Sequence, residues 1–302
     1  MHALMKRLLA GSFLFSATLA PFAVAQPTSI ARTDELRHTF SSEYSYSSRE
    51  TLDRGGPAGE VGVNRVSFAF TQRPALAPAA AGFSYGLAAD LHFLDTTRGT
   101  PLPAQLNEVA FNLGYTRPLD SRWTATVTLR PGLYGDFEDI SDRTFNAPLL
   151  LGAAYARSRE LIWLFGLRAD LRSDDPVLPF VGVRWRFADD WSLNLAFPRS
   201  GVVWQLSPDL ALDAGVSLQG GTYHISKSLG SPAGATGPLR DTFVDYREIR
   251  VGLGAEFTLT RRATLRLDAG AFTDRKFEYF KRNYTLNGDG RFYASVALRS
   301  AF

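Results

Sequence analysis

Two short motifs place a histidine next to a residue with which it could do acid–base chemistry. In Asp90-x-His92, the carboxylate could orient the imidazole as a base that activates water. In His224-x-Ser226, a base and a hydroxyl nucleophile stand two positions apart. Motifs this short often arise by chance, so two plainer interpretations stay open. The first pair could be an ion pair inside the fold, and the second an ordinary loop edge.

An acidic stretch, DFEDISD (136–142), offers carboxylate oxygens that could partner such a histidine or hold Ca²⁺. It lacks the mid-loop glycine of a calcium-binding loop. The chain contains no GK[ST] phosphate loop and no cluster of histidines for a transition metal. It also contains no cysteine, which excludes disulfides and thiol catalysis. We therefore expect no catalytic residues, no metal site and no cofactor.

The elements that must position these residues follow a period of two. Apolar and polar residues alternate through the stretches 83–93, 109–116, 123–130, 210–219, 249–259 and 265–271. This period is typical of β-strands with two different faces. A sandwich alternates as well, because its outer face meets water. Here, however, the polar positions are rich in Gly, Ala, Thr and isolated charges, as expected for the lumen of a barrel.

The connections between these stretches are asymmetric. The tight ones are PLDS, RSRE, ADD, SPD and TRR, whereas the alternate ones are mostly long, at 48–60, 95–105, 135–144, 226–241 and 275–290. Short periplasmic turns and long outer loops are typical of outer-membrane barrels. Four aromatic residues beside the tight turns are expected at the membrane–water interface: Trp123, Trp185, Phe187 and Trp191.

The sequence therefore predicts an all-β fold, a single antiparallel transmembrane β-barrel of about fourteen strands (twelve to sixteen). The strands centre near Tyr44, Phe68, Leu87, Phe111, Val127, Leu151, Phe165, Val183, Leu195, Trp204, Ala214, Val251, Leu267 and Val296. The pair in 191–207 is doubtful. Its strands have about seven residues, below the roughly 9–11 that a span needs. Pro198 within it cannot donate to a ladder.

Both ends of the chain fit an exported barrel. Lys6 and Arg7 precede the apolar run LLAGSFLFSATLA, and Ala23-Val24-Ala25 follows, which predicts a secretory signal peptide over 1–25. A short segment, 26–35, then leads into the barrel, 36–302. The last twelve residues, RFYASVALRSAF, alternate into Phe302 and predict the closing strand. A terminal aromatic resembles the assembly signal of Gram-negative outer-membrane proteins, which implies recognition of Phe302 by the outer-membrane assembly machinery.

The stretch 175–225 resembles a family of bacterial outer-membrane barrels catalogued only as a domain of unknown function. The matching elements are Pro176–Pro179, Gly182, Trp191, Leu193, Phe197-Pro198, Trp204 and Gly220–Tyr223. The likeness extends from about residue 35 to the end. It implies an outer-membrane barrel and supplies no activity and no catalytic residues.

In the central stretches, the alternate positions that should face the lumen are rich in arginine. Five arginines should face the lumen, with Asp170 as the only acid among them: Arg130, Arg168, Arg172, Arg184 and Arg186. Charges of one sign can tune the selectivity of a pore. Isolated pairs in a lumen can instead simply neutralise buried charge.

These features lead to a channel as the first functional hypothesis. We expect passive passage of small solutes across the bacterial outer membrane, with a mild anion preference. A structural or surface-interaction barrel with a blocked lumen is the alternative, and a hydrolase in the lumen or at the rim is the second alternative. The expected partners are outer-membrane lipids, the assembly machinery and small solutes. Nucleic acid is not expected, because 33 Lys and Arg nearly balance 30 Asp and Glu.

Overall fold

The computed structural model describes residues 38–73 and 82–302. The predicted signal peptide (1–25) and the segment 26–35 lie outside the described residues, so both stay predictions. Within the described residues, no helix is long and apolar enough to cross a membrane.

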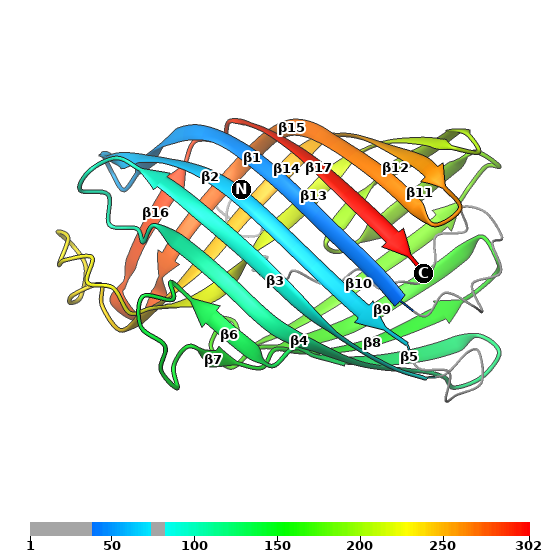
Figure 1. The fold of residues 1–302 in the computed structure, drawn as a ribbon, viewed down its shortest axis with the longest axis horizontal. Helices are drawn as coiled ribbons and strands as arrows, with labels where there is room; N and C mark the ends of the chain where they lie inside the picture. Colours follow the sequence, from blue (N-terminus) through cyan, green and yellow to red (C-terminus); the bar gives the residue numbers. More distant parts are fainter. Residues whose placement is uncertain (1–37, 74–81) are drawn as a thin grey trace, which may run out of the picture.

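Fourteen antiparallel strands form a closed barrel, as the sequence predicted (Figure 1). Each predicted strand centre lies in one of them, and the doubtful pair 191–207 belongs to the ring. The last strand pairs with the first from Thr39 opposite Ala301 to Ser47 opposite Tyr293, which closes the wall. In ring order the strands are β1 (His38–Asp53), β2 (Pro57–Gln72), β3 (Gly82–Thr96), β4 (Gln105–Pro118), β5 (Trp123–Leu129), β8 (Leu149–Ala156), β9 (Leu161–Ala169), β10 (Val177–Arg186), β11 (Trp191–Ala196), β12 (Arg199–Ser207), β13 (Leu210–Ile225), β14 (Thr242–Thr260), β15 (Ala263–Tyr279) and β17 (Phe292–Ala301).

The two ends of the barrel differ. We call the end that holds His38 and Phe302 the terminus end, and the opposite end the loop end. Tight turns such as 119–122, 157–160 and 261–262 lie at the terminus end. The loop end carries the connections 97–104 and 226–241, together with the short strands β6 (Gly132–Gly135), β7 (Phe145–Asn146) and β16 (Tyr284–Gly288). Much of the predicted loops 48–60 and 275–290 is strand, because β1, β2 and β15 run further than expected.

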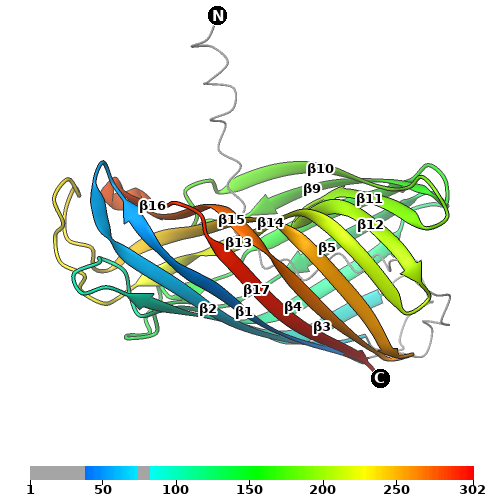
Figure 2. The same cartoon turned by 90° about the horizontal axis from the view of Figure 1, so that it is seen from above.

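The wall is uneven in height. Strands β1–β4 and β13–β15 have 14–19 residues each, whereas β11 has only 6 and β12 has 9. Figure 2 shows β11 and β12 near the terminus end. The tip of this hairpin packs against Gly182 of β10, where an added Cβ would lie 3.0 Å from the Cβ of Ala196. Only Arg184–Arg186 of β10 pair with β11. A six-residue strand is shorter than a membrane span requires.

Polarity inverts along the tall strands. In the part nearer the terminus end, the outward side chains are apolar and exposed, as for Leu87, Phe111 and Leu253. Nearer the loop end, the outward side chains are charged, as for Glu60 and Asp95, and the inward ones are apolar. Lipid requires an apolar outer face, and water a polar one. The inversion therefore marks the level at which the wall leaves the membrane.

Above this level a second, narrower ring closes. Strand β6 pairs with β4 and makes a single parallel bridge to β13, between Gly135 and His224. The ring then runs through β14, β15, β16, β1, β2 and β3 back to β4. The short strands β8–β12 are not part of this ring. A ring with about this number of strands is just filled by side chains, whereas fourteen strands leave a lumen.

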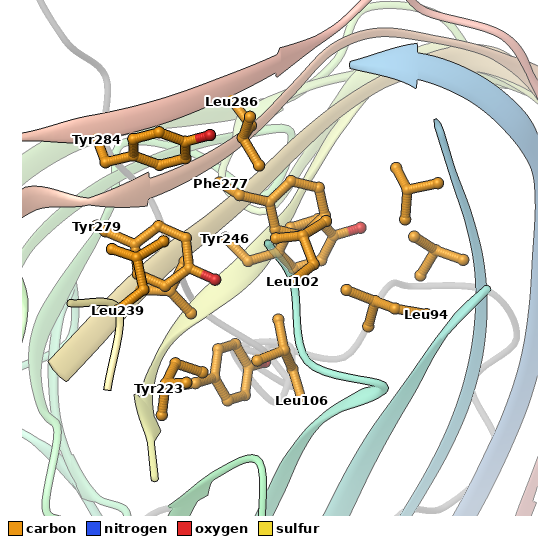
Figure 3. Close-up of a cluster of buried hydrophobic side chains, with 14 of the residues drawn as sticks. Leu94, Leu102, Leu106, Tyr223, Leu239, Tyr246, Phe277, Tyr279, Tyr284 and Leu286 are labelled. Carbon is orange, nitrogen blue, oxygen red and sulfur yellow. The ribbon is translucent and has the colours of Figure 1, made fainter. Parts of the chain in front are cut away.

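Apolar side chains fill the narrow ring (Figure 3). We call this unit the cap. Its core residues are all at most 7% exposed, and most of them come from opposite sides of the ring: Leu52, Val61, Val63, Leu94, Leu102, Leu106, Ala110, Tyr134, Tyr223, Ile225, Leu239, Val244, Tyr246, Phe277, Tyr279, Tyr284 and Leu286. Leu102 and Leu239 come from the loop-end connections. Side chains of the described residues therefore occupy the interior of the barrel at this level.

Candidate functional site

A cavity of about 390 Å³ lies in the lumen at the terminus end. The tight turns contribute Arg159, Glu160, Asp189, Asp190 and Pro208 to its lining. Strands β10–β15 contribute the inward side chains of Arg184, Arg186, Asn194, Arg199, Gln205, Asp213, Glu256 and Arg266. This volume falls within the range of small-molecule sites, although the lining is more highly charged than in most of them.

Two arginines and two aspartates form a compact ion cluster beside the cavity. The Nη2 atom of Arg199 donates to Asp213 at 2.5 Å and to Asp268 at 2.6 Å. The Nη2 atom of Arg266 donates to the same two carboxylates at 2.6 and 2.9 Å. Glu256 is held more loosely, 3.7 Å from Arg266. Because Arg199 begins β12 and Asp268 lies on β15, the cluster also ties the short hairpin to the neighbouring wall.

A second ion cluster lies between the cavity and the cap. Along β14, Glu256 lines the cavity, Glu248 belongs to this cluster, and Val244 and Tyr246 enter the cap core. Glu248 accepts hydrogen bonds from Arg250, from Arg275 at 2.6 Å and from the hydroxyl of Tyr246 at 2.8 Å. The Arg275 side chain also donates to Glu50 at 2.7 Å. All the charged members are at most 2% exposed, so their mutual pairing is what makes burial tolerable.

The five arginines predicted to line the lumen do not form one wall. Arg184 and Arg186 line the cavity together, and Arg186 lies 3.8 Å from Glu160. Arg130 lies near the cap with 12% of its side chain exposed, 2.5 Å from Glu108, and Arg168 lies 2.5 Å from Asp170.

Arg172 falls outside the strands altogether. It lies in the connection between β9 and β10, with its guanidinium 5.4 Å from the ring of Phe243. The alternation of residues therefore predicted which strand side chains face the lumen. It did not predict how far each of them lies from the two ends of the barrel.

The Asp90–His92 pair is buried beneath the cap. Asp90 accepts two hydrogen bonds from Arg65, at 2.6 and 2.8 Å. The Nδ1 atom of His92 lies 3.2 Å from the carbonyl of Leu106 and 3.9 Å from Asp90. His92 is 2% exposed. Neither residue of the pair lines the cavity at the terminus end.

His224 and Ser226 are each engaged by a different carboxylate. The Nε2 atom of His224 lies 3.0 Å from Asp241, whereas the Ser226 hydroxyl donates to Asp136 at 2.7 Å. Asp136 also accepts the backbone N–H groups of Ser226 and Lys227, at 3.0 and 2.8 Å. The acidic stretch 136–142 thus fastens its own loop to the end of β13. Within residues 38–73 and 82–302, no group of three or more His, Cys, Asp or Glu could hold a metal ion.

The predicted interface aromatics lie on the outer face beside the tight turns. Trp185 and Phe187 pack against each other with ring centroids 5.5 Å apart. Trp191 stacks on Trp204 at 5.4 Å, and Trp123 packs on Tyr155 at 4.9 Å.

At the closing seam, the N–H of Phe302 donates to the carbonyl of His38 at 2.9 Å, and the reverse bond has the same length. The backbone of Phe302 therefore forms the last pair of hydrogen bonds at the closing seam.

These features together define a transmembrane β-barrel of the outer-membrane type, with a charged cavity at one end and a filled cap at the other. Residues 89–287 match the family described as Domain of unknown function (DUF6268). This match spans more than half of the chain, which therefore belongs to that family. The family resemblance expected from the sequence is confirmed.

Three solved structures of outer-membrane proteins are similar to this chain. The COG4313 outer membrane channel from Pseudomonas putida F1 is 11% identical, with a TM-score of 0.51 over 88% of this chain and 96% of that chain. A Pseudomonas aeruginosa FadL homologue is 10% identical, with a TM-score of 0.42 over 88% and 89% of the two chains. The NanC porin is 10% identical, with a TM-score of 0.39 over 87% and 99%. The first likeness concerns the fold alone, and the TM-scores of the other two are too low to establish a common fold. No curated protein matches the chain.

Proposed function

We propose that the protein is an outer-membrane channel for small solutes, held closed at its loop end by the cap. The observation that carries the proposal is the charged cavity of about 390 Å³, inside a barrel with enough strands for a lumen. A purely structural barrel has no need to keep such a space open and lined with polar groups. Passage then requires the cap to loosen, because its core fills the axis.

The polarity of the wall supports an orientation. The cap has charged outer positions such as Glu60 and Asp95, which suit water outside the cell. The terminus end would face the periplasm, as short turns do in outer-membrane barrels. Export by the predicted signal peptide and assembly through Phe302 complete this proposal.

The proposed channel has a mild preference for anions. Arg184 and Arg186 line the cavity, and arginine keeps its charge at any working pH. Five carboxylates also line the cavity, however. We therefore expect a small preference that grows at low salt, because screening acts over about 10 Å at 0.1 M salt.

Conductance in planar bilayers tests both points. We expect brief openings of the wild type, with a reversal potential shifted slightly toward anions in a salt gradient. Replacing Arg184 and Arg186 with Glu should shift the reversal potential toward cations. The matched control is Arg122→Glu, in a terminus-end turn outside the cavity lining, which should leave selectivity unchanged. Conductance whose selectivity ignores the cavity substitutions would show that ions take another path.

A blocked barrel is the second candidate, because the cap core is filled and the charge cluster below it is fully paired. The absence of any opening at every applied voltage would favour this candidate over the channel. The hydrolase hypothesis receives no support, because His92 is buried and His224 and Ser226 bind different carboxylates.

A further inference from the structure

The cavity is charged but balanced. Five guanidinium groups in its lining (Arg159, Arg184, Arg186, Arg199 and Arg266) meet five carboxylates (Glu160, Asp189, Asp190, Asp213 and Glu256). A lining of this kind attracts a simple ion only weakly, because either sign meets as many like charges as opposite ones. It creates strong local fields that favour a solute carrying both signs.

The charged pairs differ in how firmly they are held. Arg199, Arg266, Asp213 and Asp268 are locked together by contacts of 2.5–2.9 Å. Arg186 and Glu160 are 3.8 Å apart and nearly half exposed, and Glu256 is 3.7 Å from Arg266. A solute can therefore exchange the loose contacts for its own without breaking the locked cluster. The adaptable groups are the guanidinium of Arg186 on β10 and the carboxylate of Glu256 on β14.

An uncharged acceptor lies between these two groups along the wall. Asn194 on β11 donates from Nδ2 to the carbonyl of Arg199 at 2.7 Å. Its Oδ1 atom is buried and has no hydrogen-bond partner among the described residues. Asn194 pairs directly with Arg184 of β10, so this amide lies on the Arg186 side of the cavity. Strands β11–β13 lie between Arg186 on β10 and Glu256 on β14.

We propose that the cavity binds small zwitterions whose carboxylate and ammonium groups lie at opposite ends, such as ω-amino acids and short peptides. The carboxylate meets Arg186, and the ammonium meets Glu256. An anion or cation of the same length uses one side only and leaves the other unsatisfied. This inference deepens the proposed function by naming its solute class. Binding is nevertheless measured separately from passage.

Ligand-observed NMR on the full chain in detergent micelles provides the test. The probes are 4-aminobutanoate, butanoate and butylamine, which share a chain length and differ in charge, with empty micelles as the blank. We expect 4-aminobutanoate to bind at least about threefold more tightly than either singly charged probe. This factor corresponds to one additional contact between partly exposed charges.

Two variants assign the ends of the ligand. Arg186→Gln should weaken 4-aminobutanoate and butanoate about threefold and leave butylamine unchanged. Glu256→Gln should weaken 4-aminobutanoate and butylamine and leave butanoate unchanged. The control Arg122→Gln, outside the lining, should change none of the three.

Two results would overturn the inference: butanoate binding as tightly as 4-aminobutanoate, or zwitterion binding that both variants leave unchanged. Specific binding without any conductance would uphold the inference while refuting the channel. Conductance without the ligand preference would do the opposite.

Discussion

Glu248 shows how one buried carboxylate stabilises the charged side chains of the lumen beneath the apolar cap. Its carboxylate is fully buried and contacts both Arg250 and Arg275. A carboxylate in this position holds two cations that would otherwise repel each other in a poorly solvated space. A simpler pairing recurs at Asp90, Glu108 and Asp170, each of which contacts one arginine. Pairing of this kind explains why lumen arginines need not signal a path for anions.

Neutralising Glu248 should therefore be costly. We expect Glu248→Gln to lower the free energy of unfolding by about 3–5 kcal/mol, because it leaves buried guanidinium groups without their central partner. Urea unfolding followed by tryptophan fluorescence measures the effect. The control Glu60→Gln removes an exposed carboxylate 3.9 Å from Arg49 and should cost less than about 1 kcal/mol. Equal costs for the two variants would show that the cluster is not a buried network.

At the scale of strands, the sequence predicted the membrane part well. Every lipid-facing position must be apolar, so a period of two persists even where strands are short, as in 191–195. The fourteen strand centres follow from that constraint.

The cap was missed because its inward face is apolar and because bulges change which positions of a strand face inward. In β15, the ladder skips Thr273, so that Phe277 and Tyr279 face inward although they share the parity of the lipid-facing Leu265 and Leu267. This part of β15 was interpreted as a loop. The signal was present in Phe277, Tyr279, Tyr284 and Leu286, which the local pairing of β15 with β16 brings together.

The arginines illustrate a second limit of the sequence. Parity assigned Arg168 and Arg184 to the lumen, but it could not say that one is buried with Asp170 and the other lines a cavity. Height along the barrel depends on strand register, which is fixed by contacts between neighbouring strands. The cavity residues Arg199 and Glu256 were not singled out as a site for the same reason.

The closing strand carries a prediction about assembly. Deleting Phe302 removes the two backbone hydrogen bonds to His38 and the terminal aromatic. We expect strongly reduced levels of folded protein in the outer membrane, measured by the gel mobility of unboiled samples. The control Phe292→Ala changes the same residue type at the other end of β17, where it is also exposed. This variant should assemble at near-normal levels, and normal assembly of the Phe302 deletion would contradict the proposed role of the terminus.

At the scale of the molecule, two rings of different size share the same tall strands. The fourteen-strand ring lies at the level of the membrane, where its shortest strand, β11, has six residues, and it contains polar groups and a cavity. The narrower ring stands beyond the membrane and has the apolar interior of a soluble protein. The low strands β8–β12 account for the difference, because the narrow ring passes over them through the bridge from β6 to β13. We therefore propose that the barrel is open toward the terminus end and closed by the cap at the loop end.

Thiol labelling from one side of a vesicle tests this account most directly, and the cysteine-free chain makes single cysteines unambiguous. Asp120→Cys marks the terminus end, Asp95→Cys marks the cap, and Ala211→Cys lines the cavity. The vesicles contain the protein in both orientations, and a membrane-impermeant thiol reagent is added outside for a short time. It labels the Asp120→Cys thiol only in molecules whose terminus end faces outward, and the Asp95→Cys thiol only in molecules whose cap faces outward. We predict that the cavity thiol is labelled in the same fraction of molecules as the terminus-end thiol, with the cap thiol accounting for the remainder. Labelling of the cavity thiol in all molecules would reveal an open axial path and contradict the closed cap.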